Sequence, residues 1–87
     1  MSDRAQYEKT IGELSESKLL EALLKLGADE SLDHYSRVLR ADLCKEAETR
    51  YPATEDLMRL WLDDPNRDGS YAHALVAAVL VTKEFGL

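Results

Sequence analysis

Oxygen-bearing side chains gather in one short segment of the sequence, which reads Asp64-Pro-Asn66-Arg-Asp68-Gly69. An EF-hand calcium loop begins with the same pattern, because its first, third and fifth positions supply oxygen ligands and its sixth is glycine. The twelfth position, where that loop has a bidentate glutamate, is Leu75 here. Turn-forming residues explain the same segment as a connector between two helices. We therefore expect a connector, and Asp64, Asn66 and Asp68 remain the candidate ligands of a weak calcium site.

Nucleophilic or metal chemistry would have to use Cys44, which is the single cysteine, or one of the two histidines. A cysteine nucleophile needs a base within hydrogen-bond distance. His34 precedes Cys44 by ten residues in one predicted helix, almost three turns away, and His73 could reach the thiol only through the fold. No spacing of Cys and His resembles a zinc site, and no glycine-rich phosphate loop is present. We therefore predict no enzyme activity, no cofactor and no metal, and an enzyme that uses Cys44 or a histidine is the least favoured hypothesis.

Two charged surfaces are predicted to contact a partner protein. The first is a basic run along the longest predicted helix, and it consists of His34, Arg37, Arg40 and Lys45. The second is acidic, and it consists of Asp63 and Asp64. Charged runs usually form a solvated helix face. In a chain without a catalytic set, they are also the surfaces that a partner could recognise.

Helical signals dominate the chain, because Leu, Ala, Glu and Lys are frequent and strand-like alternation is absent. Five helices are expected, at about residues 3–11, 16–26, 32–50, 55–64 and 70–85. The expected caps are Ser2, Ser15 and Thr54 for the first, second and fourth helices, and Asp29 or Ser31 for the third. Gly27 is expected to end the second helix in the left-handed conformation. The predicted fold class is a compact all-α bundle of four to five short helices, with six as the upper limit.

The predicted core comes from apolar residues at helical spacing. They are Leu32, Tyr35, Leu39, Leu43 and Ala47 in the third helix, and Leu57, Leu60 and Trp61 in the fourth. The fifth helix contains the run ALVAAVLV, residues 74–81, and is apolar all round. Such a helix is either central to the core or covered by a second subunit. The run therefore argues for self-association, and a homo-oligomer is one expectation.

Size and charge narrow the function classes. With 87 residues, the chain is expected to form a single helical domain over residues 1–87. The net charge of −6 argues against direct binding of nucleic acid or of an anionic membrane surface. The longest apolar run, residues 74–81, is too short to span a bilayer. The start MSDRAQYEKT lacks the apolar core of a secretory signal, so a cytoplasmic location is expected.

The segment from Glu48 to Leu80 resembles the later half of a death domain. In that family a helix ends in a Tyr-Pro or Asn-Pro step, and a helix closing in Leu-x-x-Trp, a polar turn and an apolar helix follow. Here those places are occupied by Tyr51-Pro52, Leu57-x-x-Leu60-Trp61 and Leu75-Val-Ala-Ala-Val-Leu80. The chain departs from the family because Trp61 is its single tryptophan. The resemblance implies a noncatalytic module that joins like domains through charged helix faces.

The leading functional hypothesis is therefore a small noncatalytic module or adaptor that binds another protein. The alternative is a small acidic inhibitor, of a mobile-element or anti-defence type, that blocks a basic nucleic-acid-binding surface of a host protein. An acidic surface can compete for a channel that is built to hold phosphates. A calcium-responsive module built on residues 64–68 is a third hypothesis.

Overall fold

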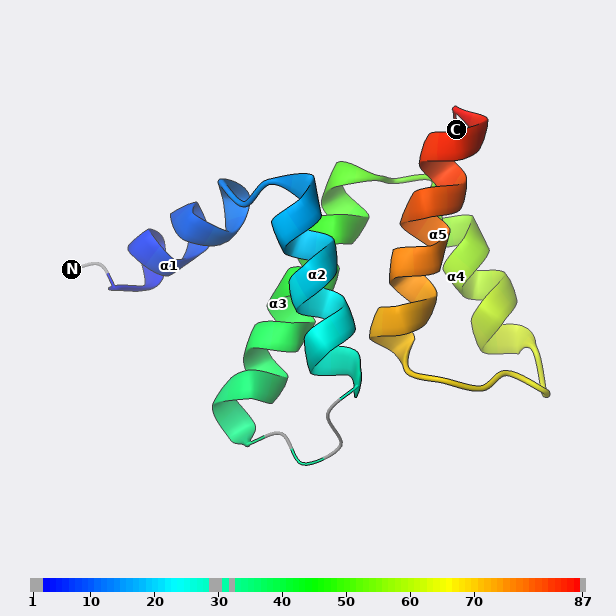
Figure 1. Ribbon diagram of the computed structural model, residues 1–87, viewed down its shortest axis with the longest axis horizontal. Coiled ribbons are helices and arrows are strands. Elements are labelled where there is room, and N and C mark those ends of the chain that lie inside the picture. The colour runs from blue at the N-terminus through cyan, green and yellow to red at the C-terminus, as the bar shows by residue number, and fades with distance from the viewer. Residues whose placement is uncertain (1–2, 29–30, 32, 87) are drawn as a thin grey trace.

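Helix-favouring residues form five α-helices in the computed structural model, which describes residues 3–28, 31 and 33–86. The helices are α1 (Asp3–Gly12), α2 (Glu16–Ala28), α3 (His34–Arg50), α4 (Thr54–Asp63) and α5 (Tyr71–Phe85). No strand occurs in the described ranges. The prediction of an all-α bundle of four to five short helices is confirmed (Figure 1).

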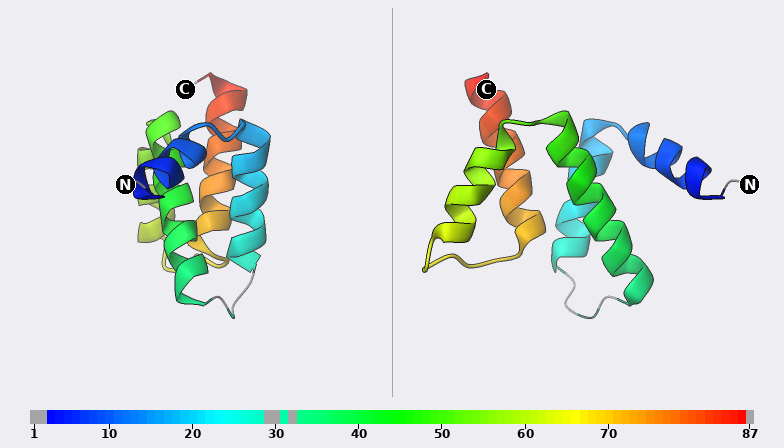
Figure 2. Two further views of the ribbon diagram at one scale, coloured as in Figure 1. Left: turned by 90° about the vertical axis from the view of Figure 1, so that its left-hand side faces the viewer. Right: turned by 180° about the vertical axis from the view of Figure 1, so that it is seen from behind.

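Helices α2, α3, α4 and α5 form two layers. α2 and α5 lie side by side in one layer, and α3 and α4 lie behind them on either side of α5 (Figures 1 and 2). α5 packs against α2, α3 and α4, whereas α1 packs mainly against α3 and projects from one end. The molecule is consequently flat, with principal extents of 43 × 32 × 19 Å.

The hydrophobic core is centred on α5. The buried residues of this helix are Ala72, Leu75, Val76, Ala78, Val79 and Thr82. Other helices complete the core with Leu19 and Leu23 from α2, Leu43, Cys44 and Ala47 from α3, and Met58 from α4. Each fully buried Leu or Val side chain stabilises the fold by about 1.5–3 kcal/mol relative to an exposed one. The apolar run in α5 is thus central to the core, which was one of the two expectations for it.

The caps of α3 and α4 differ from those predicted. α3 begins at His34 because the Asp33 side chain accepts a hydrogen bond from the Ser36 N–H at 2.8 Å, so neither Asp29 nor Ser31 is its cap. Asp29 lies outside the described residues. Thr54 is the first residue of α4 rather than its cap, and its hydroxyl donates to the Tyr51 carbonyl at 2.7 Å. This hydroxyl is fully buried and is satisfied by the preceding turn.

Gly27 does not end α2 in a left-handed conformation. The helix continues to Ala28, and the positive-φ glycines in the described ranges are Gly69 and Gly86. A Cβ atom at Gly27 would lie 2.8 Å from Ser70 Oγ and 3.0 Å from Ala72 Cβ. Glycine is therefore required at this position by the close approach of α5 to α2, and the helix ends one residue later.

Two of the residues predicted for the core are on the surface. Tyr35 is 68% exposed and Leu60 is 69% exposed, whereas Leu32 lies outside the described residues. Tyr35 is close to the beginning of α3, beyond the reach of α5. Leu60 is one residue, about 100°, round the helix from Trp61. Because α4 packs closely against α5 alone, it buries a narrow face that contains Met58 but excludes Leu60.

Membrane crossing has no support in the helices that the structure describes. None of them combines the length and the apolar composition that a bilayer span requires.

Candidate functional site

An uncovered stripe on α5 is the first part of the candidate site. We call it the α5 stripe, and it consists of His73, Ala77, Leu80, Val81 and Glu84. Leu80 is 51% exposed and Val81 is 37% exposed, although both belong to the central helix of the core. Packing against α2, α3 and α4 covers the other side of α5 and leaves this side in contact with water. The structure therefore presents large aliphatic side chains where a partner could bury them.

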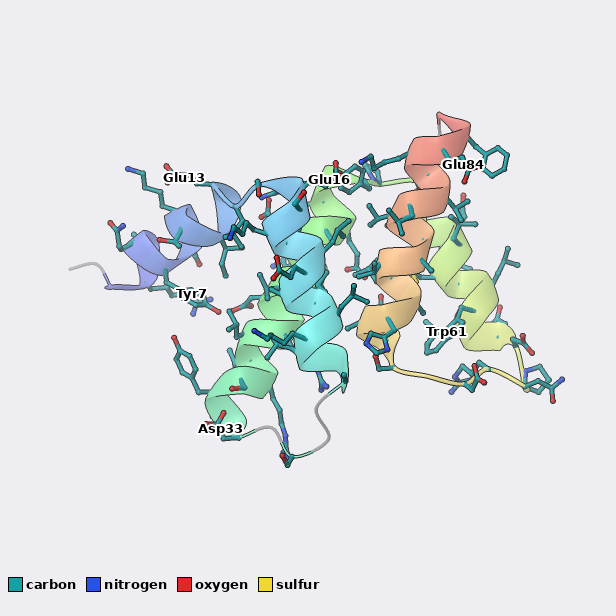
Figure 3. The ribbon with its side chains drawn as sticks, in the orientation of Figure 1. Tyr7, Glu13, Glu16, Asp33, Trp61 and Glu84 are labelled. Carbon is teal, nitrogen blue, oxygen red and sulfur yellow. The ribbon has the colours of Figure 1, made fainter. Side chains whose placement is uncertain are left out.

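A shallow groove between α4 and α5 borders the α5 stripe. This α4–α5 groove has a volume of about 460 Å³. Its apolar lining consists of Leu57, Met58 and Trp61 from α4, and of Ala74, Ala77, Ala78 and Val81 from α5. Figure 3 shows Trp61 between the two helices. The short alanine side chains leave space beside the indole of Trp61, so an apolar side chain of a partner could bind in the groove next to the stripe.

Residues 64–70 close one end of this groove and connect α4 to α5. The Arg67 guanidinium lies 5.6 Å from the centre of the Trp61 ring, and its Nη1 donates to the Leu62 carbonyl at 2.7 Å. Tyr71 packs edge-on against the same indole, with the ring centroids 6.1 Å apart. These contacts fix the connector against the end of α4.

The three calcium candidates lie on this exposed connector. The Asp64 side chain accepts a hydrogen bond from the Asn66 N–H at 2.9 Å, and Gly69 has a φ of +78°. The segment is therefore a turn of the kind that the connector hypothesis predicts. Within the described ranges, no three His, Cys, Asp or Glu side chains come together as a metal-binding group. The hypothesis of a weak calcium site at Asp64, Asn66 and Asp68 stays a prediction.

His73 links α5 to α2. Its ring Nε2 lies 3.0 Å from the Leu24 carbonyl oxygen of α2. Its backbone N–H donates to the Ser70 hydroxyl at 3.1 Å. Leu24 is itself 45% exposed, and its backbone carbonyl on α2 lies at the His73 end of the α5 stripe. The imidazole is thereby held beside Gly27, where a larger residue would collide with it.

The structure separates the two charged surfaces predicted from the sequence. The basic residues His34, Arg37, Arg40 and Lys45 are on α3, and Asp63 and Asp64 are at the end of α4. Arg40 and Lys45 border a pocket of about 580 Å³ between α3 and the start of α5, whereas His34 and Arg37 do not. In the described part of the chain, none of these six side chains forms an ion pair with another residue.

Cys44 lies in the wall of the same pocket and is 8% exposed. Burial, followed by the nearby Glu48 carboxylate, raises the pKa of the thiol to about 11. The thiol is therefore almost fully protonated at neutral pH, and a protonated thiol is a weak nucleophile. His73, the histidine that could approach it through the fold, contacts the Leu24 carbonyl instead. The absence of enzyme activity stays a prediction.

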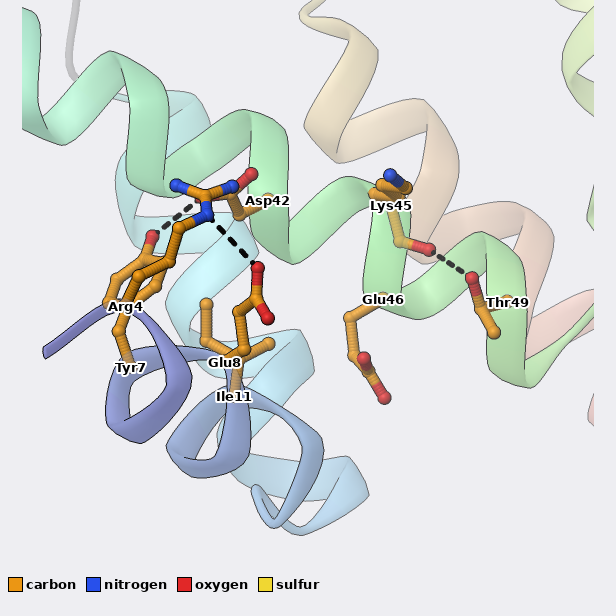
Figure 4. A pocket seen from close by; sticks show the side chains of 8 residues that line it. All are labelled: Arg4, Tyr7, Glu8, Ile11, Asp42, Lys45, Glu46 and Thr49. Atoms are coloured by element: carbon orange, nitrogen blue, oxygen red, sulfur yellow. Dashed lines mark hydrogen bonds and ion pairs between the residues drawn. The ribbon is translucent and has the colours of Figure 1, made fainter. Parts of the chain in front are cut away.

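A small pocket of about 200 Å³ marks the joint between α1 and α3 (Figure 4). The Tyr7 hydroxyl donates to Asp42 Oδ2 at 2.8 Å. Burial and then the Asp42 carboxylate raise the pKa of Tyr7 to about 12, so the phenol remains a hydrogen-bond donor at neutral pH. Ile11 is buried beside it. These contacts hold α1 against α3.

Glu16 connects three helices. The Tyr51 hydroxyl donates to Glu16 Oε2 at 2.7 Å, and the Lys83 ammonium donates to the other carboxylate oxygen. The hydrogen bond with Lys83, followed by that with Tyr51, lowers the pKa of the Glu16 carboxyl. No local sequence signal could indicate this cluster, because Tyr51 and Lys83 are 35 and 67 residues away from Glu16.

Sequence reasoning identified the apolar run of α5 but placed the contact surfaces on charged helices. The signal for the α5 stripe was present in the run itself, because an apolar helix in a two-layer bundle cannot be covered on every side. Which side stays open depends on the positions of α2 and α4.

Comparison with known proteins adds no assignment. No protein-family model, curated protein or solved structure matches the chain. The resemblance to a death domain therefore stays a prediction.

Proposed function

We propose that the protein is a small noncatalytic interaction module that binds another protein through the α5 stripe and the α4–α5 groove. One observation carries the proposal: Leu80 and Val81 are exposed on the central helix, beside an apolar groove. Cores of protein interfaces are depleted in charge and enriched in apolar and aromatic residues. Trp61, at the edge of the groove, is of the residue type that most often supplies binding energy.

The charged surfaces have a supporting role in this proposal. The basic residues of α3 and the acidic pair Asp63 and Asp64 lie on different helices, on either side of α5. Charges at the rim of an interface mainly set orientation and association rate. Charge reversal at Arg37 and Arg40, or at Asp63 and Asp64, should therefore slow association more than it speeds dissociation.

A paired comparison of leucine variants tests the proposal. Leu80→Ser removes an apolar contact from the α5 stripe, and Leu60→Ser is the matched control on the outer face of α4, with 69% exposure. Each variant and the natural chain would be immobilised and exposed to lysate of the source cell. We expect some proteins to be retained by the natural chain and by Leu60→Ser but not by Leu80→Ser. Retention of the same proteins by all three chains would contradict the assignment, provided that circular dichroism shows both variants to be folded.

The acidic inhibitor is the second candidate, and the charge near the end of α4 favours it. Asp63, Asp64 and Asp68 are exposed, and none of them forms an ion pair within the described ranges. Unpaired carboxylates could occupy a basic channel that normally binds phosphates. This function predicts capture of nucleic-acid-binding proteins that are released by moderate salt. Affinity that does not change with salt concentration would exclude it.

A further inference from the structure

Four of the five residues of the α5 stripe have a spacing that reads the same in both directions. His73, Ala77, Leu80 and Glu84 follow one another at intervals of four, three and four positions, and Val81 lies beside Leu80. Reversal of the helix therefore superimposes Glu84 on His73 and Leu80 on Ala77. A surface of this kind is self-complementary under a two-fold axis, which is how most homodimers are built.

We propose that α5 pairs antiparallel with α5 of a second copy of the chain, around a two-fold axis between Ala77 and Leu80. This proposal rests on the proposed function, since it names the partner of the same surface. In this register each Leu80 faces the small Ala77 of the second copy, so the two helices can approach closely. Alternation of large and small residues is the arrangement that fills a helix interface without voids.

The charged ends of the stripe favour the antiparallel direction. Each His73 meets Glu84 of the second copy, and this contact occurs twice. Glu84 is exposed and has no ion pair in the described part of the chain. The His73 Nε2 is held by the Leu24 carbonyl, and its Nδ1 makes no hydrogen bond within the described ranges. In the imidazolium form both ring nitrogens are donors, so Nδ1 can then donate to the Glu84 carboxylate while Nε2 donates to Leu24. A parallel pair would instead place Glu84 against Glu84, which electrostatic repulsion disfavours.

Neighbouring apolar residues extend the contact. Leu24 of α2 is exposed beside His73 and would flank the contact at that end of the stripe. The two-fold axis keeps both α4 helices on one side of the paired α5 helices. Val81 of one copy then lies near the edge of the other copy's α4–α5 groove, next to Ala77. The proposed interface therefore covers the exposed aliphatic side chains on both flanks of the stripe.

Disulfide trapping tests the register directly. In a Cys44→Ala background, Ala77→Cys and Leu80→Cys chains would be prepared separately, mixed and oxidised. The antiparallel pair predicts that the mixture forms a disulfide between positions 77 and 80 at least about tenfold faster than either chain forms a disulfide with itself. Equal or faster formation of the 77–77 and 80–80 disulfides would overturn the proposed direction.

The molar mass of the natural protein in solution tests whether the dimer forms. Sedimentation equilibrium over a concentration series should show the molar mass rising from one chain to two. Leu80→Ser should raise the dissociation constant by about a hundredfold, because the side chain is lost twice per dimer. The control Leu60→Ser should leave the constant unchanged. A natural chain that stays monomeric at every concentration would overturn the proposal.

The two proposals can fail separately. If the natural chain is monomeric but Leu80→Ser still loses its captured proteins, self-pairing is wrong and the interaction module stands. If the 77–80 disulfide forms but Leu80→Ser retains every captured protein, the pairing stands and the stripe does not bind other proteins.

Discussion

At the scale of single residues, long-range polar contacts hold the helices in register. Glu16 receives hydrogen bonds from Tyr51 and Lys83, and Tyr71 donates to Glu48 across the two layers. Burial and the Glu48 carboxylate raise the pKa of Tyr71, so its phenol stays protonated and keeps this contact. Each such bond joins parts of the chain that are distant in sequence. Their loss should therefore affect the whole fold rather than one helix.

The Glu16 cluster predicts a pH-dependent contribution to stability. The folded-state pKa of Glu16 is lowered by Lys83 and Tyr51, so its contribution is present above the ordinary value of 4.5 and is lost as the pH falls through the folded value. The pKa of Lys83 is raised, so its part is lost as the pH rises above the ordinary value of 10.5. The midpoint of thermal unfolding should be lower for Glu16→Gln near neutral pH, and the difference should shrink in strong acid.

Glu13→Gln is the control for this measurement. Glu13 is exposed just beyond α1 (Figure 3). Its side chain makes no hydrogen bond or ion pair in the described part of the chain. Its unfolding midpoint should follow that of the natural chain at every pH. A Glu16→Gln difference that is the same in acid and at neutral pH would show that the carboxylate does not act through its charge.

Cys44 should react slowly while the protein is folded. Burial raises the pKa of its thiol from 9.0 to about 11, which lowers the thiolate fraction about a hundredfold at pH 8. Alkylation by iodoacetamide, followed by mass spectrometry, should therefore be at least about a hundredfold slower in buffer than in urea. Equal rates in buffer and in urea would mean that solvent reaches the Cys44 thiol in the folded protein.

At the scale of elements, the crossing of α2 and α5 depends on a residue without a side chain. Gly27 is inside α2, and the nearest atoms to a Cβ at that position belong to Ser70, Ala72 and His73. Ala72 is itself buried on α5, so it cannot move aside. The two helices can therefore approach this closely only because Gly27 has no side chain.

Gly27→Ala should destabilise the fold by up to about 2 kcal/mol, because an overpacking cost of about 1–3 kcal/mol is offset by a gain of about 1 kcal/mol in helix propensity. Gly12→Ala is the matched control, since a Cβ there meets nothing within 4 Å. That variant should be neutral or more stable by up to about 1 kcal/mol. Urea unfolding of both variants measures the two free energies. Equal stability of the two variants would contradict the close approach of α2 and α5.

Element positions were predicted well because their signals are local. α4 spans Thr54–Asp63 and α5 spans Tyr71–Phe85, each within one residue of the range expected from the sequence. The faces of the helices were predicted less well, because burial depends on neighbours. Tyr35 and Leu60 fit the helical spacing of core residues, yet no helix covers them. The Asp33 cap was missed because Asp29, Ser31 and Asp33 are all cap-type residues within five positions, and the sequence pattern does not distinguish among them.

At the scale of the whole molecule, the helices differ in how strongly they are anchored. α5 contacts α2, α3 and α4, whereas α1 packs mainly on α3 through Tyr7 and Ile11. The candidate site could be predicted from the sequence only as an apolar helix. Its extent could not, since the exposure of Leu80 and Val81 is set by where α2 and α4 stop covering α5.

Hydrogen exchange should reveal this difference in anchoring. Backbone amides of α1 are expected to exchange faster than those of α5, because local opening of α1 breaks few buried contacts. Tyr7→Phe removes the hydrogen bond to Asp42, which is worth about 1 kcal/mol, and should speed exchange in α1 about fivefold without changing α5. Tyr35→Phe is the control, because Tyr35 makes no hydrogen bond in the described ranges. A uniform change in both helices would show that α1 opens only with the whole molecule.

The central place of α5 also has a consequence for how the protein is made. Residues 16–63 emerge from the ribosome before the helix against which most of them pack. Until α5 has left the exit tunnel, Leu19, Leu23, Leu43 and Met58 lack part of the surface that buries them in the finished fold. Part of this apolar surface therefore stays exposed until α5 has emerged. A chaperone that binds short apolar segments should engage the nascent chain throughout that interval and release it once α5 has emerged.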